Sequence, residues 1–325
     1  MRTSVSPDGG VGSVAGAFAA AVESGRLDLP DPGSGATAER WAAFAALAEE
    51  DLSLARLAEG HADALAILHE LEGPEPPPGS RWGVWAAHPP GPGLQAEQTP
   101  AGWRLHGTKQ YCSGAGSCTH ALVTAQAPDG MRLFIVTTGP LVPIPGTWAA
   151  TGMAASDTLD TDFAGIPAEP LGPPGAYTSR PGFAHGGVGV AACWYGGARA
   201  VGRTLLSAAA QGDVGQHALV HLGTVGVALR AAGGALNEAA DEIDADPGDL
   251  KSYAWARTLR VRALVEAVAT QVMWRVGRAL GAGPLCRDAA HSRRVADLTV
   301  YLRQHHAERD LAELGAIIAE RGASW

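Results

Sequence analysis

The sequence predicts an α+β fold in which a strand-rich middle section separates two helical sections. Apolar residues follow a helical period from Ala38 to Leu71, short strand-like runs separated by proline and glycine follow to about Leu171, and long helical runs begin near Ala184. A chain of 325 residues with 46% hydrophobic residues is long enough for about two compact units. The predicted domains are a short N-terminal helical domain (1–80), a middle antiparallel β barrel or sandwich (81–180) and a C-terminal four-helix bundle (181–325).

The N-terminal section predicts two consecutive helices that meet near Asp51. Residues 1–36 are rich in glycine, serine and proline and contain one short helical candidate at about 13–24. Within 38–71, one apolar stripe (Trp41, Phe44, Leu47) is out of phase with the next (Leu54, Leu57, Leu65, Leu68), which indicates a break. An aspartate side chain accepts hydrogen bonds from the unpaired amides of a first helical turn, so Asp51 is expected to start the second helix. The run 73–79, Gly-Pro-Glu-Pro-Pro-Pro-Gly, ends the helix and marks a domain boundary.

The middle and C-terminal sections differ in the length of their predicted elements. The expected strands are short: 82–87, 103–105, 120–125, 132–137 and 158–163. The expected helices are long and joined by short connections containing glycine or proline: 184–211, 215–245, 249–280 and 287–321.

Composition excludes several classes of protein. The net charge is −9 and no basic block is present, so neither nucleic acid nor an anionic membrane surface is an expected partner. Four cysteines at 112, 118, 193 and 286 lack zinc-site spacing and suit free thiols in a reducing cytoplasm. There is no leader-like N-terminus and no run of eighteen apolar residues, so a soluble cytosolic chain is expected. His217 and His221 share a helix face but have no third ligand, so no metal site is predicted.

The stretch from Gly102 to Gly116, GWRLHGTKQYCSGAG, carries the clearest chemical signal. Trp103 and Leu105 alternate with polar residues as in a half-buried strand, and Gly107 introduces a turn before a second extended run. Tyr111 and Ser113 then place a flat aromatic ring beside a hydroxyl group. A large, flat cofactor gains affinity by stacking on such a ring and is oriented by one or two polar contacts.

This stretch and its continuation, GWRLHGTKQYCSGAGSCTHALVTA, resemble a signature of the acyl-CoA dehydrogenase family. A second stretch, Thr151 to Thr158 followed by Asp162 to Pro167, resembles the family's next conserved segment in the same order. The resemblance covers about residues 38–320 and implies FAD held against the middle β domain. It also implies a homodimer or homotetramer, because the family completes its FAD site across a helical-bundle interface. The N-terminal section is shorter than in the family, which implies a substrate cavity of different construction.

The resemblance assigns seven residues to the cofactor. Tyr111 takes the place of the aromatic near the isoalloxazine ring, and Ser113 that of the hydroxyl that reaches its N5 edge. Backbone groups of Ala86 and Ala87 stand where the family contacts the pyrimidine edge, although the usual Thr side chain is absent. The turn after 277 resembles the family's pyrophosphate-binding turn and assigns Arg278, Gly281 and Ala282. The family's other phosphate-binding arginine has no counterpart in the run 209–216.

The sequence differs most from the family pattern at the position of the catalytic base. Alignment on Asp297 places His305 where most members have a glutamate, and the alternative position of that glutamate falls in His185-Gly186-Gly187. Three interpretations remain open. In the first, His305 serves as base in α,β-dehydrogenation of an acyl-CoA or related thioester, with hydride transfer to flavin N5 and an electron-transfer partner. In the second, the chain resembles the flavin monooxygenases of this fold, which lack the glutamate. In the third, it is a non-enzymatic binding or scaffold homologue.

Overall fold

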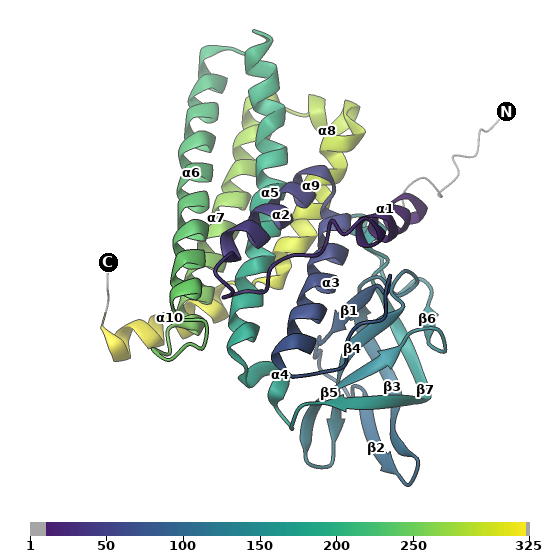
Figure 1. The fold of residues 1–325 in the computed structure, drawn as a ribbon. Helices are drawn as coiled ribbons and strands as arrows, with labels where there is room; N and C mark the ends of the chain where they lie inside the picture. Colours follow the sequence, from purple (N-terminus) through teal and green to yellow (C-terminus); the bar gives the residue numbers. More distant parts are fainter. Residues whose placement is uncertain (1–10, 323–325) are drawn as a thin grey trace, which may run out of the picture. The chain divides into compact units, whose positions relative to one another are not determined.

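The computed structural model of the chain describes residues 11–322 (Figure 1), so the first ten residues of the predicted glycine-, serine- and proline-rich segment lie outside it. The described residues form two compact units. The β unit contains residues 11–29, 56–150 and 154–183, and the helical unit contains residues 30–55, 151–153 and 184–322. The predicted α+β class is therefore confirmed.

The β unit contains a mixed sheet of seven strands. They are β1 (Trp82–Trp85), β2 (Gln95–Thr99), β3 (Gly102–Cys112), β4 (His120–Ala127), β5 (Gly130–Thr137), β6 (Val142–Ile144) and β7 (Leu159–Leu171). Their order is β1-β4-β2-β3-β7-β5, with β6 on β7 and a further pairing of β4 with β5. Most neighbours are antiparallel, but β1 and β2 pair parallel with β4, so the prediction of a purely antiparallel sheet is wrong. Long connections through other strands make those parallel pairings possible.

Large apolar side chains form two clusters in the β unit, one enclosed by the strands of the sheet and one between the sheet and α3. Trp85, Leu105, Phe134 and Phe163 are each at most 1% exposed within the sheet. Helix α3 (Leu52–Glu70) contributes Ile67 and Leu68 to a second cluster with side chains of β1, β4 and β5. Helices α1 (Val11–Glu23) and α4 (Ala176–Ser179) and the short 3-10 turn η2 (Ala154–Ser156) complete the unit.

Asp51 separates α2 (Thr37–Glu50) from α3, as predicted. One of its carboxylate oxygens accepts hydrogen bonds from the backbone amides of Ser53 at 2.8 Å and Leu54 at 3.0 Å. These contacts satisfy two amides of the first turn of α3 that have no acceptor within the helix.

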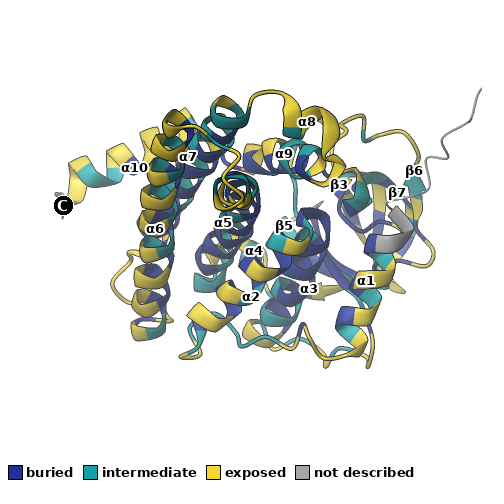
Figure 2. Cartoon of the chain, turned by 90° about the horizontal axis from the view of Figure 1, so that it is seen from above, coloured by how far each residue is buried: buried dark blue, intermediate teal, exposed yellow. Residues whose placement is uncertain are grey.

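The long helices of the helical unit run side by side in both views (Figures 1 and 2). They are α5 (Pro181–Ala210), α6 (Gln216–Ala245) and α7 (Ala254–Leu280), followed by α8 (Gly283–Arg287) and α9 (Ala289–Tyr301). Glycines on α5 allow close approach: a Cβ on Gly202 would meet Val225 of α6 at 3.2 Å, and one on Gly196 would lie 2.1 Å from the Ala45 carbonyl oxygen of α2. Residues without side chains therefore set the spacing around α5.

The fourth predicted helix, 287–321, is wrong as a single helix. Helix α9 ends at Tyr301, a 3-10 turn η3 (Leu302–Gln304) follows, and a separate α10 (Glu308–Arg321) begins after Ala307. Leu314 of α10 packs on Ala256 and Leu259 of α7. The physical reason for the break is a set of long-range contacts to residues 304–310, which is described with the site.

Helix α6 is, by length and composition, apolar enough to cross a membrane, and only 17% of its most apolar window is buried. It is the one such helix among residues 11–322. A helix of this composition also occurs in soluble proteins, and α6 packs one face on α5 through Val225. Figure 2 shows exposed residues along much of α6.

Candidate functional site

The two sequence stretches that carry the family resemblance lie side by side in the β unit. The amides of Gly114 and Ala115 donate to the carbonyl oxygens of Ser156 and Asp157 at 2.9 and 3.1 Å. The amide of Gly116 donates to the Asp157 carboxylate at 2.7 Å. We call residues 113–117 and 154–158 the paired loops. Their hydrogen bonds join segments about forty residues apart into one surface.

Tyr111 projects from a β-bulge at the end of β3. Lys109 pairs with Thr161 and Cys112 with Leu159, so two residues of β3 stand opposite Asp160 alone. A bulge of this kind turns the extra side chain away from its usual direction. Tyr111 has a positive φ of 59° and is 53% exposed, and its amide donates to the Asp160 carboxylate at 3.3 Å. A non-glycine residue at positive φ costs about 1–3 kcal/mol, so the surrounding contacts must hold it there.

Ser113 ends a chain of three hydroxyl groups. Ser156 Oγ lies 2.8 Å from Thr158 Oγ1, and Thr158 donates to Ser113 Oγ at 3.0 Å. All three residues are buried, with Ser113 8% exposed. Because Ser113 Oγ accepts from Thr158, its own proton remains to be donated, and it has no acceptor for that proton among the described residues. The arrangement leaves one hydrogen-bond donor at Ser113, two residues along the chain from the exposed Tyr111.

Ala86 and Ala87 directly follow β1 and are partly exposed. The residue before them, Trp85, donates its indole N–H to the Ser113 carbonyl oxygen at 2.9 Å. This bond fixes the end of β1 beside the paired loops. Four predicted cofactor residues thus belong to one connected part of the β unit: Ala86, Ala87, Tyr111 and Ser113.

The other predicted cofactor residues lie at the C-terminal end of α7 in the helical unit. The Arg278 guanidinium lies 4.9 Å from the centre of the Trp274 ring and makes no ion pair with another described residue. Gly281 ends α7 with a positive φ of 64°, and Ala282 precedes the first residue of α8. A stacked but unpaired guanidinium keeps its donors available for an anion.

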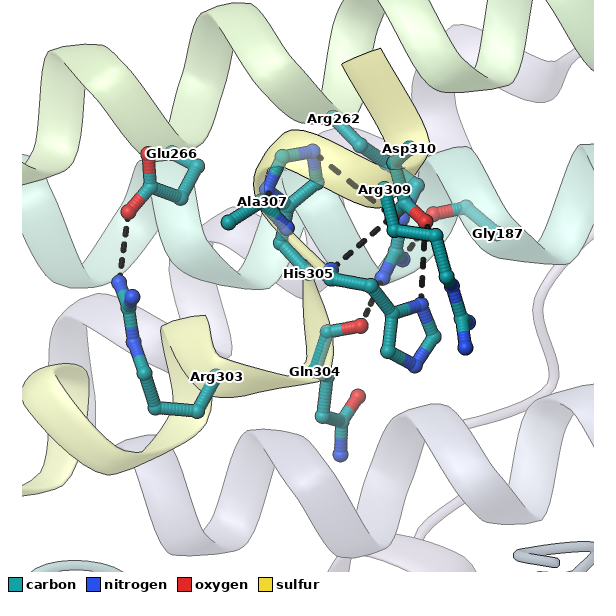
Figure 3. A network of polar contacts seen from close by, with 10 residues as sticks. Gly187, Arg262, Glu266, Arg303, Gln304, His305, Ala307, Arg309 and Asp310 are labelled. Atoms are coloured by element: carbon teal, nitrogen blue, oxygen red, sulfur yellow. Dashed lines mark hydrogen bonds and ion pairs between the residues drawn. The ribbon is translucent and has the colours of Figure 1, made fainter. Parts of the chain in front are cut away.

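His305 lies in the loop between η3 and α10 and is only 5% exposed (Figure 3). Its Nδ1 accepts the Ala307 amide at 3.2 Å, which places the proton of the neutral ring on Nε2, 3.8 Å from the Asp310 carboxylate. Burial is the main cause that lowers the pKa of His305, ahead of the opposing attraction of Asp310. The lowered pKa favours the neutral ring at pH 7. Its Nδ1 is hydrogen-bonded, whereas its Nε2 is buried and has no hydrogen-bond partner among the described residues.

Arg262 of α7 ties the His305 loop to the rest of the helical unit (Figure 3). Its guanidinium donates to the carbonyl oxygens of Gly187 at 2.9 Å and Gln304 at 2.7 Å. Arg303 adds an ion pair of 2.6 Å with Glu266. These contacts hold residues 302–307 out of a continuous helix, which accounts for the break that the sequence did not predict.

Asp297 is a buried carboxylate whose role the sequence alignment did not assign. It accepts the Met153 amide at 2.5 Å, and the adjacent Gly152 is so close to α9 that a Cβ would lie 2.2 Å from the Ala296 carbonyl oxygen. Burial raises the pKa of Asp297 to about 6. Asp297 thus anchors residues 151–153, which immediately precede the second of the paired loops.

Neither position at which the family carries its glutamate holds a carboxylate: one falls on His305 and the other in the run His185-Gly186-Gly187. His185 is 2% exposed, and its Nε2 lies 3.0 Å from the Pro247 carbonyl oxygen. His305 is enclosed as described. Neither position offers the glutamate that abstracts an α proton in the dehydrogenases this sequence resembles.

No protein-family model matches the sequence, and no curated protein matches it either. The fold is nevertheless similar to several solved structures. TdsC from Paenibacillus sp. A11-2, solved with FMN and indole, has a TM-score of 0.74 at 16% identity, with 94% of each chain covered. KijD3, solved with FMN and a dTDP-linked amino keto sugar, has a TM-score of 0.78 at 18% identity, covering 94% of this chain and 86% of that one.

A nitrososynthase from Micromonospora carbonacea var. africana covers 99% of both chains with a TM-score of 0.74 at 19% identity. All three are structures with the acyl-CoA dehydrogenase fold of flavin-dependent enzymes. The chain described here has that fold, as the sequence resemblance implied.

Proposed function

We propose that this chain is a flavin-dependent oxidoreductase and that the flavin ring rests on the paired loops. The observation that carries the proposal is the hydroxyl chain that ends at Ser113, two residues from the exposed Tyr111. The N5 atom of an oxidised flavin is a hydrogen-bond acceptor and suits the unused Ser113 proton. Tyr111 offers the stacking surface, and its fixed backbone limits the entropy lost on binding.

FAD is the flavin that the sequence resemblance implies, and Arg278, Gly281 and Ala282 are the proposed contacts of its pyrophosphate. The unpaired guanidinium of Arg278 supports this assignment. The missing second arginine favours testing FMN as well, since TdsC and KijD3 were both solved with FMN. A bound flavin supplies two-electron redox chemistry, and these residues would hold and orient it.

Among the reactions open to this fold, we favour monooxygenation. Dehydrogenation of an acyl thioester requires a base at the α carbon. Neither family position for that base holds a carboxylate, because one holds the buried His305 and the other falls in His185-Gly186-Gly187. Monooxygenation does not require that carboxylate. TdsC, which has the same fold, is a dibenzothiophene monooxygenase.

Acyl thioester dehydrogenation stays a second proposal because burial keeps the His305 imidazole neutral, the form that a base needs. For this reaction the His305 ring would have to turn out of its contacts with Ala307 and Asp310. It would also require an electron-transfer partner to reoxidise the flavin.

Flavin titration with matched tyrosine variants tests the site. Removing an aromatic platform costs about 1–3 kcal/mol of stacking energy, or about ten- to a hundredfold in affinity. We expect Tyr111→Ala to lose that much affinity for FMN, measured by quenching of flavin fluorescence. Tyr253→Ala serves as control because Tyr253 is also 53% exposed. Equal affinity of the Tyr111→Ala variant and the wild type would contradict the proposed platform.

Two reactions of the flavin-loaded protein separate the proposed activities. If the protein is a monooxygenase, chemical reduction of its bound flavin should let it consume oxygen and transfer one oxygen atom to an aromatic or amine substrate. Dehydrogenation predicts instead that an acyl-CoA bleaches the bound flavin without oxygen, and that His305→Ala abolishes the bleaching. Bleaching that survives His305→Ala would remove His305 from the reaction.

We further propose a homodimer or homotetramer that covers the exposed face of α6 and α7. Val220 and Val227 are 61% and 73% exposed, and Trp274 of α7 is 52% exposed. Trp274 contacts His221 of α6 edge-to-face at 6.3 Å, which joins these side chains into one patch. An exposed apolar patch on a soluble protein marks an interaction surface.

Light scattering with charged variants tests this interface. Val227→Glu is expected to shift the protein to monomers, because burying an unpaired carboxylate is costly. Leu250→Glu is the control, since Leu250 is 90% exposed and lies in the turn after α6. A monomeric wild type, or a Val227→Glu variant with unchanged mass, would contradict the interface.

Buried free thiols at Cys112, Cys118 and Cys193 support a cytoplasmic location, because thiols stay reduced in that compartment.

A further inference from the structure

An open polar pocket of about 360 Å³, which we call the cavity, lies at the surface of the helical unit, and its lining residues Arg203, Ser207, Gln211 and Asp288 are exposed. It is bounded by the end of α2, the C-terminal half of α5 and the start of α9. The side chains that matter for its chemistry are Glu49, Arg203, Ser207, Gln211, Asp288 and Arg294. Its volume falls in the range of sites for small organic ligands, about 300–1,000 Å³.

The spacing of residues on α5 explains why this face is hollow and polar. Arg203 and Ser207 lie four residues apart on an exposed face of α5, and Gln211 directly follows the end of that helix. Ala200 and Ala208 also line the cavity and leave room because they end at Cβ. Small and hydrogen-bonding side chains therefore line this exposed face, whereas Val201 and Leu205 of the same helix are buried.

The carboxylates of the cavity are already engaged by protein donors. One carboxylate oxygen of Glu49 forms an ion pair with Arg199 at 2.7 Å, and the other forms an ion pair with Arg203 at 2.5 Å. Asp288 caps α9, where its side chain accepts the amides of Ala290 and His291, each at 3.0 Å. These acids therefore orient neighbouring groups more than they attract a ligand cation.

The donors of the cavity, in contrast, are largely unused. The side chains of Arg294, Ser207 and Gln211 make no hydrogen bond with another residue in the described part of the chain. An arginine guanidinium has five N–H donors in a fixed fork, and a hydroxyl and an amide add more. Arg203 contributes a second guanidinium to the lining. A ligand that fills this cavity must be rich in acceptor oxygens.

We propose that this cavity binds the phosphate or pyrophosphate group of an organic ligand. Two guanidinium groups from different helices match the oxygens of such a group through paired, charge-assisted hydrogen bonds. Ser207 and Gln211 supply neutral donors on the same wall. The inference does not depend on the proposed flavin site, because every lining residue belongs to the helical unit.

Calorimetric titration with inorganic pyrophosphate and with ADP tests the site. Both are expected to bind saturably, and Arg294→Gln is expected to weaken them at least about tenfold, the effect of losing charged hydrogen bonds. Arg293→Gln is the matched control: Arg293 precedes Arg294 in the chain, pairs with Asp51 at 3.2 Å and does not line the cavity. A second pair, Ser207→Asp and Ser207→Asn, introduces a repelling charge or a neutral group of the same size.

Competition identifies the source of the phosphate group. If FAD or FMN displaces ADP and riboflavin does not, the cavity takes the phosphate end of the flavin. If ADP binds equally well to protein saturated with FMN, it takes a separate phosphorylated ligand. The proposal is overturned if neither pyrophosphate nor ADP binds, or if Arg294→Gln and Ser207→Asp bind them as the wild type does. ADP binding by a protein that binds no flavin would leave this inference intact and refute the proposed function.

Discussion

Replacing Asp157 with alanine should loosen the paired loops without unfolding the β unit. The Asp157 side chain accepts the Gly116 amide at 2.7 Å, a bond with a charged acceptor that contributes about 1.5–3 kcal/mol. Asp157 also has a positive φ of 47°, which alanine adopts at a cost of about 1–2 kcal/mol. Asp157→Ala should therefore destabilise the loop pair by about 2.5–5 kcal/mol, whereas Asp157→Asn keeps an acceptor and tolerates the backbone.

Hydrogen exchange at the Gly116 amide measures this effect directly. Each 1.4 kcal/mol of lost local stability speeds exchange about tenfold, so the alanine variant should exchange at least about tenfold faster than the asparagine variant. FMN titration should show the same order, because Ser113 belongs to the loop that Asp157 holds. If the alanine and asparagine variants had equal protection and equal flavin affinity, the paired loops would not form the flavin support.

Three further variants test the packing of the helical unit. Burial raises the pKa of Asp297 from 3.8 to about 6, so the folded state binds its proton more readily than the unfolded chain and stability from this group rises as pH falls from 7 towards 4. Asp297 is 4% exposed, and the resulting change in the free energy of unfolding between pH 7 and pH 4 is at most about 3 kcal/mol. In urea unfolding, the Asp297→Asn variant should therefore be more stable than the wild type at pH 7 and lose that advantage near pH 4. A constant difference across this range would contradict the buried carboxylate.

Gly196→Ala should destabilise by about 1–3 kcal/mol through overpacking, since the new Cβ would meet the Ala45 backbone. Gly315→Ala in α10, with nothing within 4 Å, should stabilise by up to about 1 kcal/mol. Equal effects of the two glycine variants would show that α2 and α5 do not approach so closely.

The predicted elements agree with the structure where local pattern decides the conformation. Two out-of-phase apolar stripes predicted the break, and the capping ability of Asp51 predicted its position. The predicted helix 215–245 agrees with α6 (216–245) to within a residue. Strand β2 was missed because its sequence, QAEQT, buries only Ala96 and so lacks the alternation of a half-buried strand. Its conformation depends on pairing with β3, a tertiary contact that no local pattern reveals.

The same distinction between local pattern and long-range contact applies to the residues of the candidate site. Tyr111 and Ser113 were predicted from a motif, and the structure brings them to one end of β3. Thr158 and Ser156 complete the hydroxyl chain but were not assigned individually, because Thr158 contacts Ser113 from 45 residues away and Ser156 contacts Thr158. The break at 302–307 was missed for a related reason: no proline or glycine occurs there, and Arg262 of α7 imposes it from outside.

Flavin binding by the purified protein is the most direct test of this account. We expect the chain to take up one FMN or FAD, with a visible flavin spectrum, and Ser113→Ala to shift that spectrum by removing the hydrogen bond proposed for the N5 edge. Threonine at position 113 should preserve it. A colourless protein that binds neither flavin under any condition that keeps it folded would contradict the central claim.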